Sequence, residues 1–298
     1  MKQPATSDVS AGLRRDAETL AGALPPLLAS AEHLAASVMM GEHGRRRVGQ
    51  GDEFWQYRPS HAGDEMRHID WRRSARSEDA LFVREKEWQA AQSVMIWLDT
   101  GRSMDFASEK NLPKKGEAAR RLALALSILL IRGGERVGLS NAGLPPRTGK
   151  VQLMRLTSAM ALEESEADYA APRLSGAPPR SRAVMISDFM GDISEATAAL
   201  TKAADRGIEG VLLQVLDPQE EAFPFDGRTI FESVGGTLSH ETLKAGDLRE
   251  RYLQRLAERK AELKALTRRT GWQFHTYHTD KAASAALLWL YNALERVH

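Results

Sequence analysis

From Ser93 onward, the chain alternates between short apolar runs and longer stretches whose apolar residues recur at helical spacing. The short runs, bounded by glycine, proline or charged residues, predict buried strands, and the longer stretches predict helices. The predicted strands are residues 94–99, 136–140, 182–188, 210–217 and 272–278, and the predicted helices are residues 114–132, 151–164, 192–206, 246–270 and 282–296. This alternation predicts an α/β fold, in which helices cover both faces of a mostly parallel sheet.

Three segments depart from this pattern and set the expected domain organisation. Residues 11–40 have apolar positions at helical spacing, with a break at Pro25-Pro26, and predict an N-terminal helix. Residues 41–89 are rich in Gly, Arg, Asp and aromatic residues without a helical period, which predicts a β-containing segment of short strands and ordered loops. Within the main domain, residues 90–296, the Pro- and Gly-containing stretch at 220–242 predicts a projecting β-hairpin.

Two of the predicted strands end in aspartate, Asp99 and Asp188, and a hydroxyl at Ser103 follows in the loop after the first. In an open α/β sheet, ligands bind at the carboxyl ends of the strands. Carboxylate and hydroxyl oxygens suit Mg²⁺, Mn²⁺ or Ca²⁺, so these residues predict an oxygen-lined cation site, to which Thr148 is added from its loop position alone. The alternative is that the aspartates cap helices and accept hydrogen bonds from loop N–H groups.

The loop DTGRS, which begins at Asp99, resembles the metal-ion-dependent adhesion site of von Willebrand factor A domains. That site has the pattern Asp-x-Ser-x-Ser after a first strand and an aspartate after a later one, to which Asp99, Ser103 and Asp188 correspond. Gly101 stands in place of the first serine and supplies no side-chain oxygen. The resemblance therefore implies a Rossmann-like, von Willebrand A-like fold and a degenerate site, at which binding of Mg²⁺ or another divalent cation is weak or absent.

A second resemblance spans roughly residues 13–296. Residues 44–87, GRRRVGQGDEFWQYRPSHAGDEMRHIDWRRSARSEDALFVREKE, are similar to the signature of the bacterial family called domain of unknown function fifty-eight, as are the later stretches VMISDFM and VLDPQEEAFPFDG. That family couples such a segment to a von Willebrand A-like domain and is typically encoded beside MoxR-type AAA+ ATPases. The resemblance implies a non-enzymatic adaptor that acts with such an ATPase on a protein client. A metal-dependent hydrolase using Asp99 and Asp188, or a purely structural scaffold, are the alternatives.

Between Arg45 and Arg76, eight arginines lie among five acids and several aromatic residues. In one interpretation this segment is a partner-binding surface, because arginine binds carboxylates in bidentate fashion and aromatic residues anchor interfaces. In the other, the charges pair internally and fix loops. The candidate partner-binding residues are Arg67, Asp70, Arg72 and, in the loop after Asp99, Arg102.

Composition excludes several functions. With Lys+Arg 41 against Asp+Glu 40, the chain lacks the positive charge that favours nucleic acid. It has no cysteine, and neither a Gly-x-Ser-x-Gly nor a Walker A pattern occurs. The first thirty residues have no apolar core of the signal-peptide type, and no window approaches the ~20 apolar residues of a membrane span. We therefore expect a cytoplasmic protein that does not insert into membranes.

Overall fold

The computed structural model of the chain describes residues 27–38, 54–61, 66, 69–76, 81–86, 91–162, 167–227, 229–232, 239–242 and 246–295. The chain divides into two compact units, one formed by Met1–His43 with Gln92–His298 and the other by Gly44–Ala91. In the N-terminal part, residues 27–38 are helical, and the remainder of the helix expected at 11–40 lies outside the described residues.

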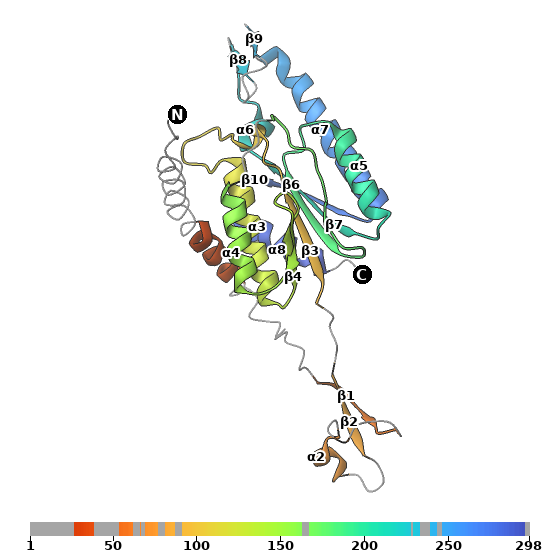
Figure 1. Cartoon of the computed structure of the whole chain (residues 1–298). Helices are drawn as coiled ribbons and strands as arrows, with labels where there is room; N and C mark the ends of the chain where they lie inside the picture. Colours follow the sequence, from red (N-terminus) through yellow and green to blue (C-terminus); the bar gives the residue numbers. More distant parts are fainter. Residues whose placement is uncertain are drawn as a thin grey trace, which may run out of the picture. The chain divides into compact units, whose positions relative to one another are not determined.

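The larger unit is built on a sheet with the strand order β10-β7-β6-β3-β4-β5 (Figure 1). The strands are β3 (Ser93–Leu98), β4 (Arg136–Leu139), β5 (Leu144–Arg147), β6 (Arg182–Ser187), β7 (Glu209–Leu216) and β10 (Gln273–His278). Neighbouring strands from β10 to β4 are parallel, and β5 is antiparallel to β4. Parallel strands place their carboxyl ends at one edge, so the loops after β3, β6 and β7 meet there.

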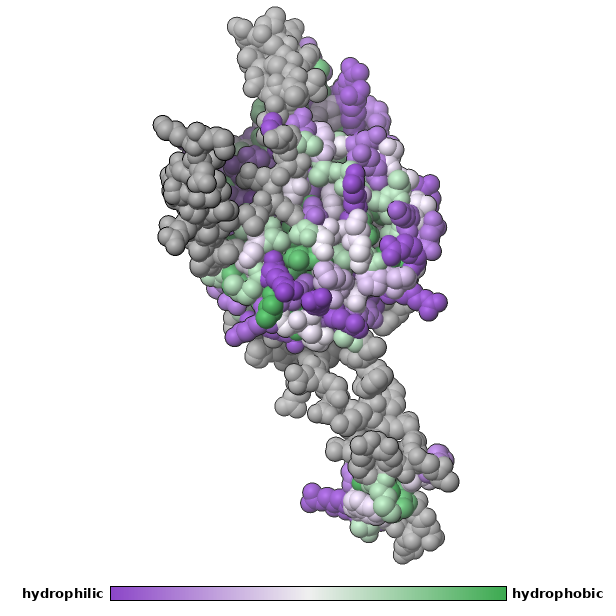
Figure 2. Space-filling view, viewed as in Figure 1, coloured by the Kyte–Doolittle hydropathy of each residue, from purple (hydrophilic) through white to green (hydrophobic). Residues whose placement is uncertain are grey.

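Helices cover both faces of this sheet, as Figure 1 shows. One face carries α3 (Lys115–Arg132), α4 (Lys150–Leu162) and α8 (Ala283–Glu295), and the other carries α5 (Ile193–Ala204) and α7 (Gly246–Thr270). Successive side chains of a strand point to opposite faces, so Val94, Ile96 and Leu98 of β3 pack with α3, while Met95 and Trp97 pack with α5. Burial on both faces explains why these strands are continuous apolar runs. Figure 2 shows that the solvent side of the α5 and α7 layer, on the right, is mostly hydrophilic.

The α/β class, with a mostly parallel sheet between two helical layers, is confirmed; the closer likeness to von Willebrand A domains stays a prediction. The sequence did not predict β5, whose residues Pro145 and Pro146 argue against a strand. These prolines are tolerated because β5 is an edge strand with no partner on its outer side among the described residues, and its pairing with β4 is irregular, with a register shift between Val137 and Leu139. Two further short elements, α6 (Pro218–Ala222) and the 3-10 helix η2 (Arg102–Met104), lie in loops at the carboxyl edge.

Between β7 and α7, strands β8 (Thr229–Glu232) and β9 (Ser239–Thr242) pair antiparallel with each other. They fall within residues 220–242, where a hairpin was predicted. None of the helices in the described part of the chain is both long enough and apolar enough to cross a membrane.

The smaller unit contains an antiparallel pair, β1 (Phe54–Pro59) and β2 (Phe82–Lys86), and the short helix α2 (Trp71–Ser74). The carboxylate of Asp70 accepts hydrogen bonds from the backbone N–H groups of Arg72 (3.1 Å) and Arg73 (3.0 Å) and so caps α2. The Ser74 hydroxyl donates to the Asp70 carbonyl and accepts from the N–H of Phe82, which ties the helix to β2. Asp70 therefore has a structural role in this unit.

Candidate functional site

Three aspartates lie at the carboxyl edge of the sheet. Asp99, Asp188 and Asp217 directly follow the neighbouring strands β3, β6 and β7, and all three are buried. Strand order therefore brings together Asp99 and Asp188, as sequence reasoning expected, and adds Asp217, which it missed. The signal for Asp217 was present, because the apolar run GVLLQVLD ends in aspartate in the same way as the other two strands.

The carboxylate of Asp99 is held by three hydrogen bonds. Its Oδ1 accepts from the N–H groups of Gly101 (2.8 Å) and Ala170 (3.2 Å), and its Oδ2 accepts from the Ser187 hydroxyl (2.6 Å). Burial raises the pKa of Asp99 to about 6, against the effect of the Ser187 hydrogen bond, and the nearby carboxylate of Asp188 adds to the rise. Asp99 thus joins its own loop to residue 170 and to the end of β6, and it titrates closer to neutral pH than an exposed aspartate.

Gly101 occupies a position where no side chain fits. A Cβ atom there would lie 2.7 Å from the Asp168 carbonyl oxygen, 2.8 Å from Tyr169 Cα and 2.9 Å from Asp99 Oδ1. Such distances are far inside van der Waals contact, so the backbone of residues 167–170 fills the space that a serine side chain would use. The loop therefore lacks both the serine side chain and the space for it.

Backbone hydrogen bonds fix this segment on the loop after β3. The N–H of Arg102 donates to the Ala167 carbonyl (3.0 Å), and the N–H of Ser103 donates to the Asp168 carbonyl (2.9 Å). The Ser103 hydroxyl is buried and has no hydrogen-bond partner within the described residues. Arg102 is exposed beside it.

Asp188 is paired with a lysine that sequence reasoning missed. The Nζ of Lys115, the first residue of α3, lies 2.9 Å from Asp188 Oδ2 and 2.7 Å from Glu220 Oε1. Asp188 Oδ1 accepts from the Met190 N–H (3.0 Å), and the Phe106 ring lies 5.8 Å from the ammonium group. Burial acts to lower the pKa of Lys115, but attraction to the two carboxylates outweighs it and leaves the pKa raised, so Lys115 stays charged.

A helix cap positions Glu220. Asp217 is the N-cap of α6: its Oδ1 accepts from the Gln219 N–H (2.9 Å), and its own N–H donates to Glu220 Oε2 (2.8 Å). Asp217 Oδ2 also accepts from the Ser108 N–H (2.8 Å). The string DPQE has the spacing of a capping box with proline at the first helical position, so sequence reasoning could have found this helix start.

The structure corrects the inclusion of Thr148. This residue is exposed and follows β5, which runs antiparallel to β4 and ends with Arg147 opposite Val137 near the start of β4. Thr148 therefore lies at the amino edge of the parallel strands, away from Asp99, and cannot join its site. The position and direction of β5 determine where Thr148 lies, and the sequence alone did not indicate them.

The remaining predicted residues belong to the smaller unit. Asp70 caps α2, as described above, and Arg72 is exposed on that helix. Arg67 lies outside the described residues. A partner-binding role for Arg67, Asp70 and Arg72 stays a prediction.

A resident divalent cation does not fit the residues at the strand ends. The two oxygens of Asp99 already accept from N–H and O–H donors, and those of Asp188 accept from an ammonium and an N–H group. The space for a ligand at position 101 is filled by backbone. A hard cation needs several oxygen lone pairs directed at one point. Here each of these oxygens accepts from a donor of the chain, and the Lys115 ammonium already supplies positive charge beside Asp188.

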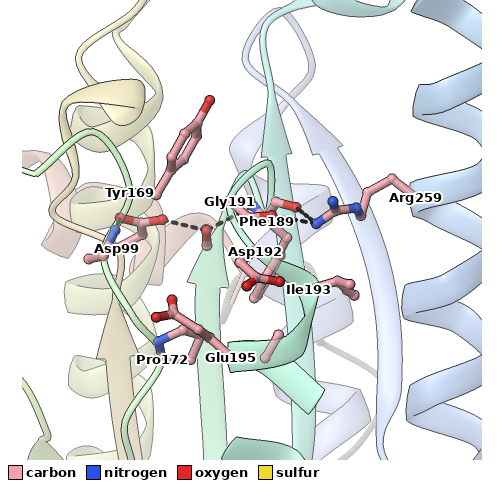
Figure 3. Close-up of a pocket in the computed structure, with 12 residues that line it drawn as sticks. Asp99, Tyr169, Pro172, Phe189, Gly191, Asp192, Ile193, Glu195 and Arg259 are labelled. Atoms are coloured by element: carbon pink, nitrogen blue, oxygen red, sulfur yellow. Dashed lines mark hydrogen bonds between the residues drawn. The ribbon is translucent and has the colours of Figure 1, made fainter. Parts of the chain in front are cut away.

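A small pocket opens beside Asp99 (Figure 3). Its lining residues include Asp99, Tyr169, Ser187, Gly191, Glu195 and Arg259. Nη1 of Arg259, from α7, donates to the carbonyls of Phe189 (3.1 Å) and Gly191 (2.7 Å), which fixes the loop after β6. A Cβ atom at Gly191 would lie 2.9 Å from Tyr169 Cβ, so the two loops touch here. Figure 3 shows the Tyr169 ring directed away from Asp99, and 46% of this residue is exposed.

Comparison with known proteins gives a family but no activity. The family model described as "Protein of unknown function DUF58" matches residues 56–262. Uncharacterized proteins Rv1480 of Mycobacterium tuberculosis and Mb1516 of Mycobacterium bovis are each 26% identical, over 94% of this chain and 92% of theirs.

Two solved structures are similar to this chain. An aerotolerance-related membrane protein from Bacteroides fragilis is 18% identical with a TM-score of 0.40, over 69% of this chain and 100% of its own. The conserved hypothetical protein BatB from Bacteroides thetaiotaomicron is 16% identical with a TM-score of 0.36, over 70% of this chain and 98% of its own.

Proposed function

Since the chain belongs to the DUF58 family of proteins of unknown function, we propose that it is a non-enzymatic adaptor that acts with a MoxR-type AAA+ ATPase on a protein client. The ATPase and the maturation or remodelling of a protein complex follow from the resemblance that the sequence carries, and the proposal places the protein in the cytoplasm, as expected from the sequence. The docking point in this proposal is the loop of residues 99–105, the counterpart of the adhesion-site loop.

The observation that carries the proposal is the bonding of the strand-end carboxylates. Asp99, Asp188 and Asp217 each accept hydrogen bonds from at least two different groups of this chain. Carboxylates held in this way stabilise loops, whereas a general base needs an oxygen directed at a substrate. A rigid loop edge also loses little conformational entropy when a partner binds, which favours affinity.

Two side chains on this edge have the character of interface anchors. Arg102 is exposed in the loop after β3, and Tyr169, 46% exposed, lies on the segment that covers Gly101. Tyrosine and arginine are enriched among the residues that dominate binding energy at protein interfaces. We place the partner contact at these two residues.

A pull-down and titration with the cognate ATPase test the proposal. Tyr169→Ala and Arg102→Ala should each weaken binding roughly tenfold, because each removes an anchor from the docking edge. Arg147→Ala is the matched control, since this exposed arginine lies at the opposite edge of the sheet. Unchanged melting temperatures must accompany the loss of binding. Absence of association in every nucleotide state would reject the adaptor role.

The sequence offered a metal-dependent hydrolase that uses Asp99 and Asp188 as the alternative, and one observation favours hydrolysis at these residues, although a resident divalent cation does not fit them. Asp99 has a pKa raised to about 6, contacts the Ser187 hydroxyl and lines a pocket, and perturbed carboxylates of this kind concentrate at catalytic sites. Hydrolysis of ester or phosphoester probes by the purified protein, abolished in Asp99→Asn and retained in Tyr169→Ala, would favour this alternative over the adaptor.

A further inference from the structure

Four buried or nearly buried acids converge on the carboxyl edge of the sheet. Asp99, Asp188 and Asp217 follow three adjacent strands, and the side chain of Glu220 is 18% exposed. Like charges brought together in a poorly solvated place repel and lose hydration, so such a cluster needs a cation. In many proteins that cation is a divalent metal ion held by carboxylate oxygens.

We infer that Lys115 is the cation of this site, built into the chain in place of a divalent metal ion. Its ammonium group lies 2.9 Å from Asp188 Oδ2 and 2.7 Å from Glu220 Oε1, and its side chain is 1% exposed. It therefore bridges the loop after β6 and the helix after β7, which are the contacts that a shared metal ion would make. The domain consequently needs no divalent ion to hold these loops together.

The local sequence shows how specific this placement is. Lys114 and Lys115 are neighbours, yet Lys114 is 48% exposed and pairs with Asp105, itself 62% exposed, while Lys115 is buried. The first residue of a helix is an unfavourable place for a cation, because the positive end of the helix dipole lies there. Burial adds a second cost. Two carboxylates in direct contact offset both, which explains why a lysine is stable at this position.

The same contacts exclude a metal ion from the pair. Glu220 Oε1 accepts from the ammonium and Glu220 Oε2 accepts from the Asp217 N–H, so each oxygen of Glu220 already has a donor within the chain. A divalent ion bound to Asp188 would lie beside the buried Lys115 ammonium, and repulsion between the two positive charges opposes its binding. This inference is independent of the adaptor role, because it concerns the ion requirement of the domain alone.

Thermal unfolding of the full chain tests it. Wild-type protein stripped with EDTA should have the same melting temperature with and without millimolar Mg²⁺, Mn²⁺ or Ca²⁺. Lys115→Ala should melt about 10 °C lower, because it leaves two carboxylates uncompensated. In that variant, a divalent ion should raise the melting temperature, since the vacated space lies between two carboxylates that have lost their counter-charge. Lys114→Ala is the matched control, and its melting temperature should stay within about 2 °C of the wild type.

Glu220→Gln provides a milder variant if Lys115→Ala fails to fold. It keeps an oxygen for Lys115 but removes one charge, so it should melt lower than the wild type without any response to divalent ions. The inference would be overturned by a wild-type melting temperature that rises with a divalent ion and loses that rise in Asp188→Asn. It would equally be overturned if Lys115→Ala were as stable as Lys114→Ala, or as indifferent to divalent ions as the wild type.

Discussion

Substituting serine for Gly101 separates what the sequence suggests from what the structure requires. Judged by the adhesion-site pattern, Gly101→Ser restores a missing ligand and should strengthen metal binding. In the structure, the new Cβ would lie 2.7 Å from the Asp168 carbonyl oxygen and 2.8 Å from Tyr169 Cα. Both are backbone atoms, which cannot move aside as a flexible side chain can. We expect Gly101→Ser to destabilise the protein and to create no metal site.

The magnitude follows from the contact distances. The backbone at Gly101, with φ −61° and ψ 154°, is in a region open to every residue, so the cost is purely steric. Forcing extra atoms into a packed site typically costs about 1–3 kcal/mol, and the shortest contacts here fall well below 3.0 Å. We expect a loss of about 3 kcal/mol in the free energy of unfolding, which corresponds to about 6–12 °C in melting temperature for a unit of this size.

Urea denaturation followed by tryptophan fluorescence measures this loss, and calorimetric titration with Mg²⁺ measures any gained site. Gly133→Ser is the matched control, because Gly133 has a negative φ of −75° and a Cβ there would meet nothing closer than 3.4 Å. It should change the free energy of unfolding by no more than about 0.5 kcal/mol. A Gly101→Ser protein as stable as the control, or one that binds Mg²⁺ where the wild type does not, would refute the reasoning.

Two further predictions concern the same edge. Because the folded pKa of Asp99 is raised from 3.8 to about 6, its ionisation disfavours the folded state, and its effect on stability worsens as pH rises through that window. Asp99→Asn should therefore gain stability relative to the wild type by up to roughly 3 kcal/mol between pH 4 and pH 7, and a pH-independent difference would contradict the assignment. Arg259→Ala removes the hydrogen bonds to Phe189 and Gly191 and should lower the free energy of unfolding by about 2 kcal/mol with faster amide exchange in that loop, whereas exposed Arg255→Ala should leave both unchanged.

The helices and strands of the larger unit could be predicted because each carries its own signal along the chain. The strand expected at residues 94–99 is Ser93–Leu98, and the helix expected at 246–270 is Gly246–Thr270. Strands buried on both faces are uninterrupted apolar runs, and the glycines that follow several helices mark their ends. Strand β5 was not predicted because its local signal is misleading. Pro145 and Pro146 indicate a turn unless the strand is known to lie at the edge of a sheet.

The sequence could predict only those site residues whose place follows from the α/β fold itself. Asp99 and Asp188 could be predicted because residues that follow parallel strands share an edge of the sheet. Lys115 could not be predicted, since its partners lie 73 and 105 residues away and the local string PKKGE indicates only an ordinary helix start. Thr148 was placed wrongly for the same reason: the direction of β5 is a property of the sheet and is not marked in the sequence around it.

The prolines of β5 have a consequence for association between copies of this protein. A strand at the margin of a sheet normally offers a row of N–H and C=O groups with which a strand of another molecule can pair, and this is a common route to aggregation. Pro145 and Pro146 remove two consecutive donors from this strand, which is only four residues long. A foreign strand approaching β5 would thus find an interrupted hydrogen-bonding edge, and the sheet stops growing at β5.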